Sequence, residues 1–234
     1  HRHEIYPEYK ANRVKAPDDF KAQIPIVQEL VNKLNIPNLI IPWYEADDII
    51  ASIVKKHNED SEILFNIFSA DKDLKQLLND NVIFTDPSKW TPYKTKDFIQ
   101  EFLFQPENIL DYLALIGDSA DNIKWVPGIW PKWAGTLIQK YQNIENIYQH
   151  IDEISGWIKE KLLDWKEEAF KSKDLISLLD VPEVNTIGIE DYRFDIDFNK
   201  YNEILVKEQN FVSMEKAIKE LKNKFQMPQQ TSLF

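Results

Sequence analysis

The sequence predicts an α/β fold in its first part and a mostly helical fold in its second part. Short apolar runs alternate with amphipathic segments as far as Thr91, which is typical of strand–helix units around a parallel sheet. After that point only helical patterns follow. The 234 residues are enough for one or two domains with a sizeable core.

The first part contains three predicted helices and three predicted strands. The first helix is indicated by apolar residues at helical spacing, from Phe20 to Leu34. In chain order, we expect a helix at Asp18–Leu34, a strand at Ile36–Ile41, a helix at Glu45–His57, a strand at Glu62–Ser69, a short helix at Asp73–Leu78 and a strand at Asn81–Thr85.

The second part is predicted to be helical, with the domain boundary near Thr91. The expected helices are Thr95–Phe104, Glu107–Ile116, Pro131–Tyr141, Ile144–Ile151, Ile158–Leu179 and Phe211–Phe225. We therefore expect one domain over residues 1–92, a helical region over residues 93–225 and a mobile tail over residues 226–234.

Charge and composition restrict the function classes. The net charge of −11 by itself argues against nucleic-acid binding, which needs cations. However, His1–Ala16 carries four Lys or Arg against two acids, and many later acids are tightly clustered, which suggests bound cations. The absence of cysteine excludes thiolate metal sites and fits a reducing compartment. No apolar run could span a bilayer, so we expect a cytoplasmic protein without membrane contact.

The first acidic cluster is YEADD, which contains Glu45, Asp47 and Asp48. Glu45 and Asp48 share a helix face, and Asp47 borders it. Three carboxylates this close repel each other and need a cation or open water. The alternative is a solvated helix N-terminus, where acids suit the helix dipole.

Two further clusters follow. SADKDL brings Asp71 and Asp73 to the carboxyl end of a predicted parallel strand, where ligands bind in open α/β sheets; a helix N-cap is the alternative. GDSADN brings Asp118 and Asp121 to a helix end, and an Asp/Asn-rich turn is the alternative there.

Together the clusters supply seven carboxylates on separate segments, with no His or Cys among them. Oxygen-only ligands suit Mg²⁺ or Mn²⁺ rather than zinc. Two such ions about 4 Å apart stabilise the attacking and leaving oxygens of a phosphodiester displacement. The candidate ligands are Glu45, Asp47, Asp48, Asp71, Asp73, Asp118 and Asp121.

The stretch VPGIWPKWAG, Val126–Gly135, combines turn residues with a helix start. Such a turn between two helices can offer main-chain N–H groups and a helix N-terminus to one DNA strand. Lys132 would add a point charge at that terminus.

The order of these motifs resembles the 5′→3′ exonuclease and flap endonuclease family, which includes the N-terminal nuclease domain of bacterial DNA polymerase I. The resemblance runs from His1 to about Pro182 and is carried by RHEIYPEYKANR, YEADDIIASIVKK, DKDLKQLL and YLALIGDSADNI followed by VPGI.PK.A. It implies a PIN-like (resolvase-like) parallel sheet with helices and a helix-hairpin-helix region. It also implies cleavage of DNA at 5′ flaps and single-strand tails with two divalent cations.

The resemblance also implies roles for individual residues. The seven carboxylates match the family's metal ligands. The start of the helical arch that encloses the single strand is matched by Arg2, Tyr9, Lys10 and Arg13. Of these, Lys10 and Arg13 are expected to be catalytic, with Lys10 positioning the scissile phosphate. The hairpin that grips duplex backbone, with K⁺ on its carbonyls, is matched by Val126, Gly128, Ile129 and Lys132.

Two departures from the family pattern matter. Family members carry two further aspartate-bearing strands before the arch, whereas this chain starts at His1. We therefore expect a fragment that folds poorly and cuts slowly or not at all. At the other end, Gln230, Leu233 and Phe234 are similar to the short motif by which bacterial repair proteins bind the sliding clamp. An amphipathic chain end is the alternative.

Tryptophan is unusually frequent. The chain has 7 Trp and 5 Gly, whereas average usage of roughly 7% predicts about 16 Gly. The family's turns carry glycine at the positions of Trp43, Trp125 and Trp130. Most of the seven tryptophans look like glycine positions; the other four are Trp90, Trp133, Trp157 and Trp165.

Three explanations compete for these tryptophans. Ordinary tryptophans would put Trp125 and Trp130 at positive φ, at a cost on the order of 1 kcal/mol or more. A stacking platform for unpaired bases accounts for one or two of them. The favoured explanation is a UGA codon, read as glycine in certain bacterial lineages and translated here as tryptophan.

The sequence thus predicts a structure-specific 5′ nuclease of replication and repair, impaired in this chain. A non-catalytic DNA-structure-binding or clamp-associated module is the alternative. A third possibility, an RNA-cutting PIN-type enzyme, is disfavoured by the hairpin motif, which suits duplex backbone.

Overall fold

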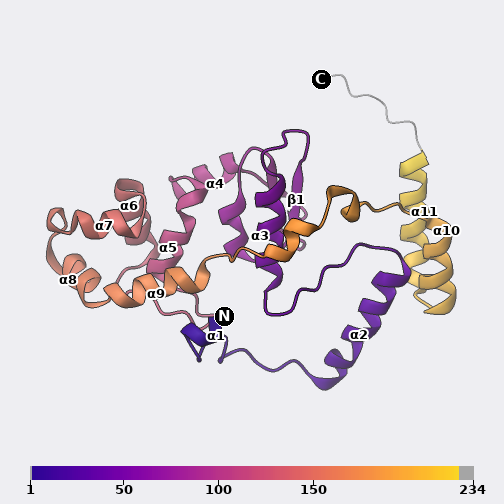
Figure 1. The fold of residues 1–234 in the computed structure, drawn as a ribbon, viewed down its shortest axis with the longest axis horizontal. Coiled ribbons are helices and arrows are strands. Elements are labelled where there is room, and N and C mark those ends of the chain that lie inside the picture. Colours follow the sequence, from indigo (N-terminus) through magenta and orange to yellow (C-terminus); the bar gives the residue numbers. More distant parts are fainter. Residues whose placement is uncertain (1, 227–234) are drawn as a thin grey trace. The chain divides into compact units, whose positions relative to one another are not determined.

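The computed structural model describes residues 2–226, and the chain divides into two compact units (Figure 1). The first unit contains residues 1–14 and 41–185, and the second contains residues 15–40 and 186–234. Each unit is therefore built from two separate stretches of sequence. Across residues 2–226, no helix is both long enough and apolar enough to cross a membrane.

The first unit contains a sheet with the order β1-β2-β3. Strand β1 (Phe65–Phe68) pairs in parallel with β2 (Val82–Thr85), with Phe65 opposite Val82. This pair confirms the predicted α/β fold. Strand β3 (Pro92–Tyr93) pairs antiparallel with β2 and was not predicted, because two residues give no periodicity. The sheet is therefore mixed rather than purely parallel.

The strand predicted at Ile36–Ile41 is wrong. Residues 36–41 form no strand, and the division between the two units falls at residue 40. Pro37 lies inside this run and Pro42 follows it. Because proline has no N–H to donate to a ladder, the apolar run lacks one of the bonds a strand needs. The predicted strand Glu62–Ser69 is confirmed in its central residues only.

The helices of the first unit follow the predicted pattern closely. The predicted helix at Ile158–Leu179 is two helices, which break at Trp165. The α-helices are α1 (Arg2–Ile5), α3 (Ala46–His57), α4 (Thr95–Phe102), α5 (Ile109–Ile116), α6 (Pro131–Tyr141), α7 (Ile144–Gln149), α8 (Gly156–Asp164) and α9 (Lys166–Ile176). Short 3₁₀ helices are η1 (Lys72–Leu77), η2 (Pro106–Asn108), η3 (Ile151–Glu153) and η4 (Pro182–Thr186).

One apolar core holds the sheet and these helices together. Its centre is α5, which packs against α6, α9 and η1. Val82 of β2, Leu115 of α5 and Ile138 of α6 are all fully buried. Burial of each such side chain contributes roughly 1.5–3 kcal/mol. The carboxylate-bearing segments are therefore attached to one packed body.

The second unit has a smaller core. It consists of α2 (Asp18–Lys33), η5 (Ile189–Tyr192), α10 (Phe198–Tyr201), the π-helix η6 (Asn202–Glu208) and α11 (Val212–Gln226). Leu30 and Leu34 pack on Ile204, Leu205 and Ile218. The remaining apolar face predicted for the first helix is largely exposed, with Phe20 at 56% and Val27 at 54%. The core therefore uses only the C-terminal end of α2.

Within the first unit, a buried ion pair joins Arg2 of α1 to Asp48 of α3. The Arg2 guanidinium donates two hydrogen bonds to the Asp48 carboxylate, at 2.9 and 2.8 Å, and the Asp48 side chain is fully buried. Arg2 also donates to the carbonyls of Leu175 and Ser177, while the Leu179 N–H donates to Asp48. Three segments distant in sequence therefore meet at one bidentate pair.

We predict that Arg2→Ala destabilises the first unit by roughly 3–5 kcal/mol, because it leaves the Asp48 charge buried without its partner. The matched control is Lys55→Ala on α3, the helix that carries Asp48. It breaks only the exposed Lys55–Asp180 pair and should cost less than about 1 kcal/mol. Urea unfolding followed by circular dichroism measures both. Equal effects of the two substitutions would contradict this account.

Candidate active site

The first carboxylate cluster lies at the N-terminus of α3. Glu45 is the N-cap residue, and its N–H donates to the Asp48 carboxylate at 3.0 Å in a capping box. Acids at this end of a helix are stabilised by the exposed N–H groups and the helix dipole. Part of the cluster therefore serves the helix, as the alternative interpretation expected. Asp47 takes no part in the capping box.

The Asp48 carboxylate is also occupied by hydrogen bonds within the protein. Burial alone would raise the pKa of Asp48, but the hydrogen bonds from Arg2 and from the Leu179 N–H outweigh it and hold this pKa below its usual value. Both Asp48 oxygens accept hydrogen bonds from the protein. Arg2, expected to contact DNA, and Asp48, expected to bind metal, are thus committed to each other.

The second cluster follows β1, as predicted. Asp71 caps the N-terminus of η1 by accepting the Asp73 N–H at 3.0 Å, and its own N–H donates to Ser69 at 3.0 Å. The N-cap alternative therefore holds for Asp71. The Asp73 side chain is different, because its Oδ1 atom is buried and has no hydrogen-bond partner. An unpaired buried carboxylate oxygen is costly and calls for a compensating positive charge.

The third cluster is positioned by Gly117, which ends α5 at φ 68°. A Cβ atom at this residue would lie 2.7 Å from the Ile123 carbonyl, so only glycine fits. The following turn is closed by hydrogen bonds in both directions between the main chains of Asp118 and Ile123. The Asp118 carboxylate accepts the Ala120 N–H at 2.8 Å and pairs with Lys72 at 3.3 Å.

The pKa values of two aspartates indicate that the three carboxylate clusters lie close together. Burial, followed by the charge of Asp71, raises the pKa of Asp73 to about 7, and Asp118 and Asp121 add to the effect. Burial and the charges of Asp71 and Glu45 raise the pKa of Asp47 to about 6. Carboxylates from α3, from the end of β1 and from the turn after α5 therefore feel each other's charge.

Three residues from the segment after α1 converge on the same place. Lys10 pairs with Glu45 at 2.6 Å and with Asp121 at 3.6 Å. The buried Tyr9 hydroxyl donates to both of these carboxylates, and Arg13 pairs with Asp121. Burial, then the charges of Glu45 and Asp121, raises the pKa of Tyr9. The structure thus places Tyr9, Lys10 and Arg13 beside Glu45 and Asp121, and the roles expected for them stay predictions.

The residues fit a divalent cation in part. Within the described range, no group of three or more His, Cys, Asp or Glu side chains is close enough to form a preassembled metal site. Against this, Asp73 has an unpaired buried oxygen, and burial together with neighbouring carboxylates raises the pKa values of Asp47 and Asp73. Oxygen donors of this kind suit Mg²⁺ or Mn²⁺.

The hairpin after the third cluster buries two of its apolar side chains and exposes Trp125 and Trp130. Val126 and Ile129, expected to contact DNA, are buried in the core. Gly128 between them adopts φ 90°, which favours glycine. Trp130 is the N-cap residue of α6 and Lys132 is exposed in its first turn.

The strain expected at two tryptophans is absent. Trp130 has φ −79°, and Trp125 is not among the described residues with positive φ. The expectation that Trp125 and Trp130 stand at positive φ is therefore wrong. Positive φ occurs instead at Trp43, with φ 76°, and at Trp90, with φ 55°.

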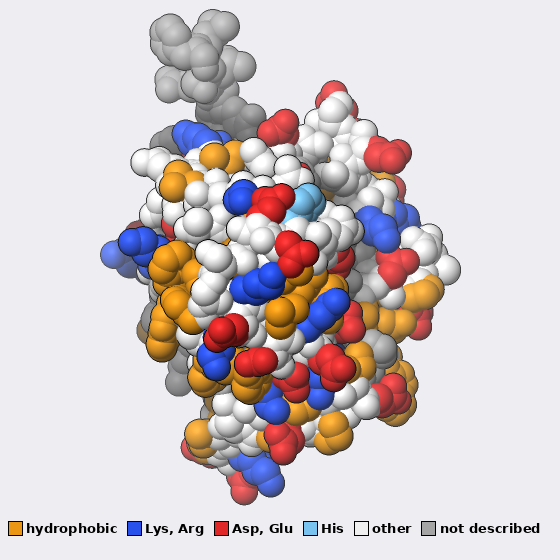
Figure 2. All heavy atoms as spheres, turned by 90° about the vertical axis from the view of Figure 1, so that its left-hand side faces the viewer, with side chains coloured by type: hydrophobic (Ala, Val, Ile, Leu, Met, Phe, Trp, Pro, Cys, Tyr) orange, Lys and Arg blue, Asp and Glu red, His pale blue; other side chains and the backbone are white. Residues whose placement is uncertain are grey.

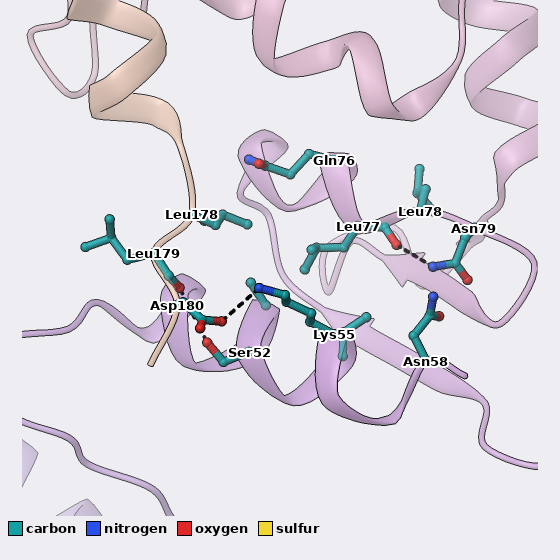
Figure 3. A pocket seen from close by; sticks show the side chains of 12 residues that line it. Ser52, Lys55, Asn58, Gln76, Leu77, Leu78, Asn79, Leu178, Leu179 and Asp180 are labelled. Carbon is teal, nitrogen blue, oxygen red and sulfur yellow. Dashed lines mark hydrogen bonds and ion pairs between the residues drawn. The ribbon is translucent and has the colours of Figure 1, made fainter. Parts of the chain in front are cut away.

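Two cavities of the first unit flank the carboxylates. Figure 3 shows a cavity of about 400 Å³ between α3, η1 and the segment after α9, with Lys55 paired to Asp180 at its edge. It contains none of the predicted site residues. A second cavity of about 370 Å³ begins at Ala70, next to Asp71. It is lined by Ala70, Lys72, Lys75, Phe84, Asp86, Lys89, Thr91, Pro92, Tyr93 and Glu101.

Sequence reasoning missed Lys72 and Lys75 as parts of the site. Lys72 stands inside the DKD motif and pairs with Asp118, and Lys75 lies 4.5 Å from the Tyr93 ring centre. A lysine between two aspartates was the available signal. The expected clamp-binding residues Gln230, Leu233 and Phe234 lie outside the described residues.

Comparison with known proteins places the chain in a family. The family model for the 5′-3′ exonuclease N-terminal resolvase-like domain matches residues 1–103, and the model for the 5′-3′ exonuclease C-terminal SAM fold matches residues 104–197. A 5′-3′ exonuclease of Aquifex aeolicus is 34% identical over the whole chain, which covers 78% of that protein. DNA polymerase I of Bacillus subtilis is 37% identical over 81% of the chain, which covers 22% of the polymerase.

Solved structures agree with these matches. A T5 flap endonuclease complex with DNA and metal ions has a TM-score of 0.64 and 26% identity, over 87% of this chain and 78% of that one. The T5 5′-exonuclease with divalent metal ions bound has a TM-score of 0.64 and 28% identity, over 76% and 69% of the two chains. With both family models matching in succession, the chain belongs to the 5′-3′ exonuclease family.

Proposed function

We propose that this chain carries the site of a metal-dependent nuclease that hydrolyses DNA phosphodiester bonds at 5′ flaps and single-stranded 5′ ends. The carrying observation is the group of mutually repelling carboxylates beside Lys10 and Arg13. A site of this kind needs added positive charge and is bordered by cations that can hold a phosphate. The DNA and metal ions bound to the T5 flap endonuclease support the same assignment.

The metal ligands we propose are Asp47, Asp71, Asp73 and Asp118, with Glu45 and Asp121 at the border. Bound Mg²⁺ or Mn²⁺ would supply charge stabilisation at the attacking and leaving oxygens of the cleaved bond. Asp48 acts differently in this proposal: its pair with Arg2 fixes the N-terminus of α3 and thereby positions Asp47.

Lys10 and Arg13 hold the phosphate in this proposal. Each is paired with an acid in the absence of DNA. Cations held by these acids would supply positive charge there, and Lys10 and Arg13 would then be free to hold the scissile phosphate, which also carries negative charge. Lys10 and Arg13 would therefore exchange a carboxylate partner for the phosphate.

DNA contacts extend from the site in two directions. The cavity next to Asp71 carries Lys72, Lys75 and Lys89 together with the acids Asp86 and Glu101. On the other side, the hairpin and Lys132 at the start of α6 offer main-chain groups and a positive charge to duplex backbone. Figure 2 shows basic and acidic side chains interspersed over the face formed by α6, α7 and α8, so local contacts rather than net charge would bind DNA there.

Several finer assignments remain predictions of the sequence. These are K⁺ at the hairpin carbonyls, sliding-clamp binding through Gln230, Leu233 and Phe234, impaired cleavage by this chain, and the division into residues 1–92 and 93–225. A flap-cleavage assay in Mg²⁺ tests the cleavage rate, and pull-down with a bacterial sliding clamp tests the tail.

We predict that Asp73→Asn and Asp118→Asn each lower the rate of 5′-flap cleavage at least about 100-fold, because each removes charge stabilisation made in the transition state. Binding of a flap substrate, measured by fluorescence anisotropy in Ca²⁺, should be unchanged or tighter. The control is Asp80→Asn, an exposed acid before β2. Mg²⁺-dependent cleavage that is equally fast with Asp73→Asn, Asp118→Asn and Asp80→Asn would contradict the proposed role of these carboxylates.

We also predict that this site makes stability depend on pH. The pKa values of about 6 for Asp47 and about 7 for Asp73 exceed the ordinary value of 3.8. The folded state therefore binds more protons than the unfolded state between about pH 4 and 7, and stability falls as pH rises through that window. Cations replace these protons, so Mg²⁺ should stabilise the chain more at about pH 8 than at about pH 5.

Thermal unfolding with and without Mg²⁺ measures this effect. At about pH 8 without Mg²⁺, Asp73→Asn should unfold roughly 2–4 °C above the unsubstituted chain, because it removes repulsion worth about 1 kcal/mol. It should also lose most of the Mg²⁺ response. A Mg²⁺ response equal to that of Asp80→Asn would show that Asp73 does not take part in cation binding.

A further inference from the structure

The tryptophans occupy positions that do not use their size. Six of the seven are between 41% and 92% exposed, and only Trp165 packs against the core. Tryptophan is normally among the more buried residue types, since its ring is the largest apolar side chain. These positions therefore gain little from carrying the largest side chain.

Two of these positions have a positive φ, as do six other described non-glycine residues, among them Lys10, Leu103 and Gln142. Trp43 adopts φ 76° in the turn before Glu45, and Trp90 adopts φ 55° in the turn between β2 and β3. Bulky side chains are rare at such angles because Cβ approaches the main chain, whereas glycine adopts them freely. Three of the five glycines in the chain, Gly117, Gly128 and Gly156, also have positive φ.

A third observation concerns the proposed DNA-binding hairpin. The atoms nearest to a Cβ built on Gly128 belong to the Trp157 ring, at 3.1 and 3.8 Å. The Trp157 ring thus covers Gly128, the hairpin residue that has no side chain. Trp133 contacts this ring edge-on, at 5.9 Å between ring centres. A hairpin that offers its main chain to DNA is obstructed by both rings.

A base-stacking platform does not explain this pattern. Stacking requires a flat ring face open to an unpaired base. The Trp133 and Trp157 rings instead lie at 88° to each other. Trp90 leans on Phe68 at the sheet, at 5.9 Å between ring centres. The exposed tryptophans are thus spread over unrelated turns and helix starts.

We propose that the protein made by its source organism carries glycine at residues 43, 90, 125, 130, 133, 157 and 165, because the gene uses the codon UGA at these positions and reads it as glycine. The exposure, the positive φ of Trp43 and Trp90, and the covered Gly128 carry this inference. At the hairpin it rests on the proposed function, since it uncovers main chain for duplex DNA. Elsewhere it stands independently.

The decisive experiment reads the seven codons in the source DNA and the mass of the corresponding peptides in the endogenous protein. We expect UGA at all seven positions and glycine masses in the peptides. UGG codons overturn the proposal, and so do UGA codons whose peptides carry the mass of tryptophan. Neither result depends on whether the protein is a nuclease.

A binding measurement tests the consequence at the hairpin. Trp157→Gly combined with Trp133→Gly should raise the affinity for a duplex with a 5′ tail roughly tenfold, about 1.4 kcal/mol. Trp90→Gly, which changes a distant turn, should leave this affinity unchanged. Unchanged affinity for all three substitutions, with UGA codons confirmed, would contradict DNA binding by the hairpin and leave the glycine assignment intact. UGG codons would overturn the glycine assignment even if the affinity rises.

Discussion

The structure depends on one electrostatic constraint: carboxylates gathered at the carboxyl end of a strand need positive charge. Asp47, Asp71, Asp73 and Asp118 come from three segments, and their repulsion, together with burial, raises the pKa values of Asp47 and Asp73. The chain itself supplies part of the charge through Lys10, Arg13 and Lys72. The remainder is what a divalent cation would provide, which links folding, metal binding and DNA cleavage in one account.

Adjacent acids meet this constraint in opposite ways. Asp48 is neutralised by Arg2 in a bidentate pair, and its pKa is held low. Asp47, the preceding residue, has no such pair, and burial together with the charges of Asp71 and Glu45 raises its pKa. One helix N-terminus thus carries a structural acid and an acid that we propose as a metal ligand. The difference arises from tertiary partners and not from helix position alone.

Much of the fold could be predicted from the sequence, because local patterns encode it. The parallel pair β1 and β2, helix α3 and the helices after residue 93 follow from periodicity. The strand expected at residues 36–41 failed because an apolar run interrupted by proline does not specify a ladder partner. The apolar face predicted for α2 is largely exposed for a related reason. Periodicity predicts which residues share a face, but not whether another element covers that face.

The pairings of the candidate site residues could not be predicted from the sequence. The acidic clusters could be read from the sequence, whereas the Arg2–Asp48 pair joins residues 46 positions apart and leaves no local signal. The account therefore turns on whether cations bind the unpaired acids. A crystal structure grown in Mn²⁺ tests this directly through anomalous scattering: the account predicts peaks in contact with the carboxylates of Asp73 and Asp118 and none on Asp48. Peaks on Asp48, or none beside Asp73, would contradict it.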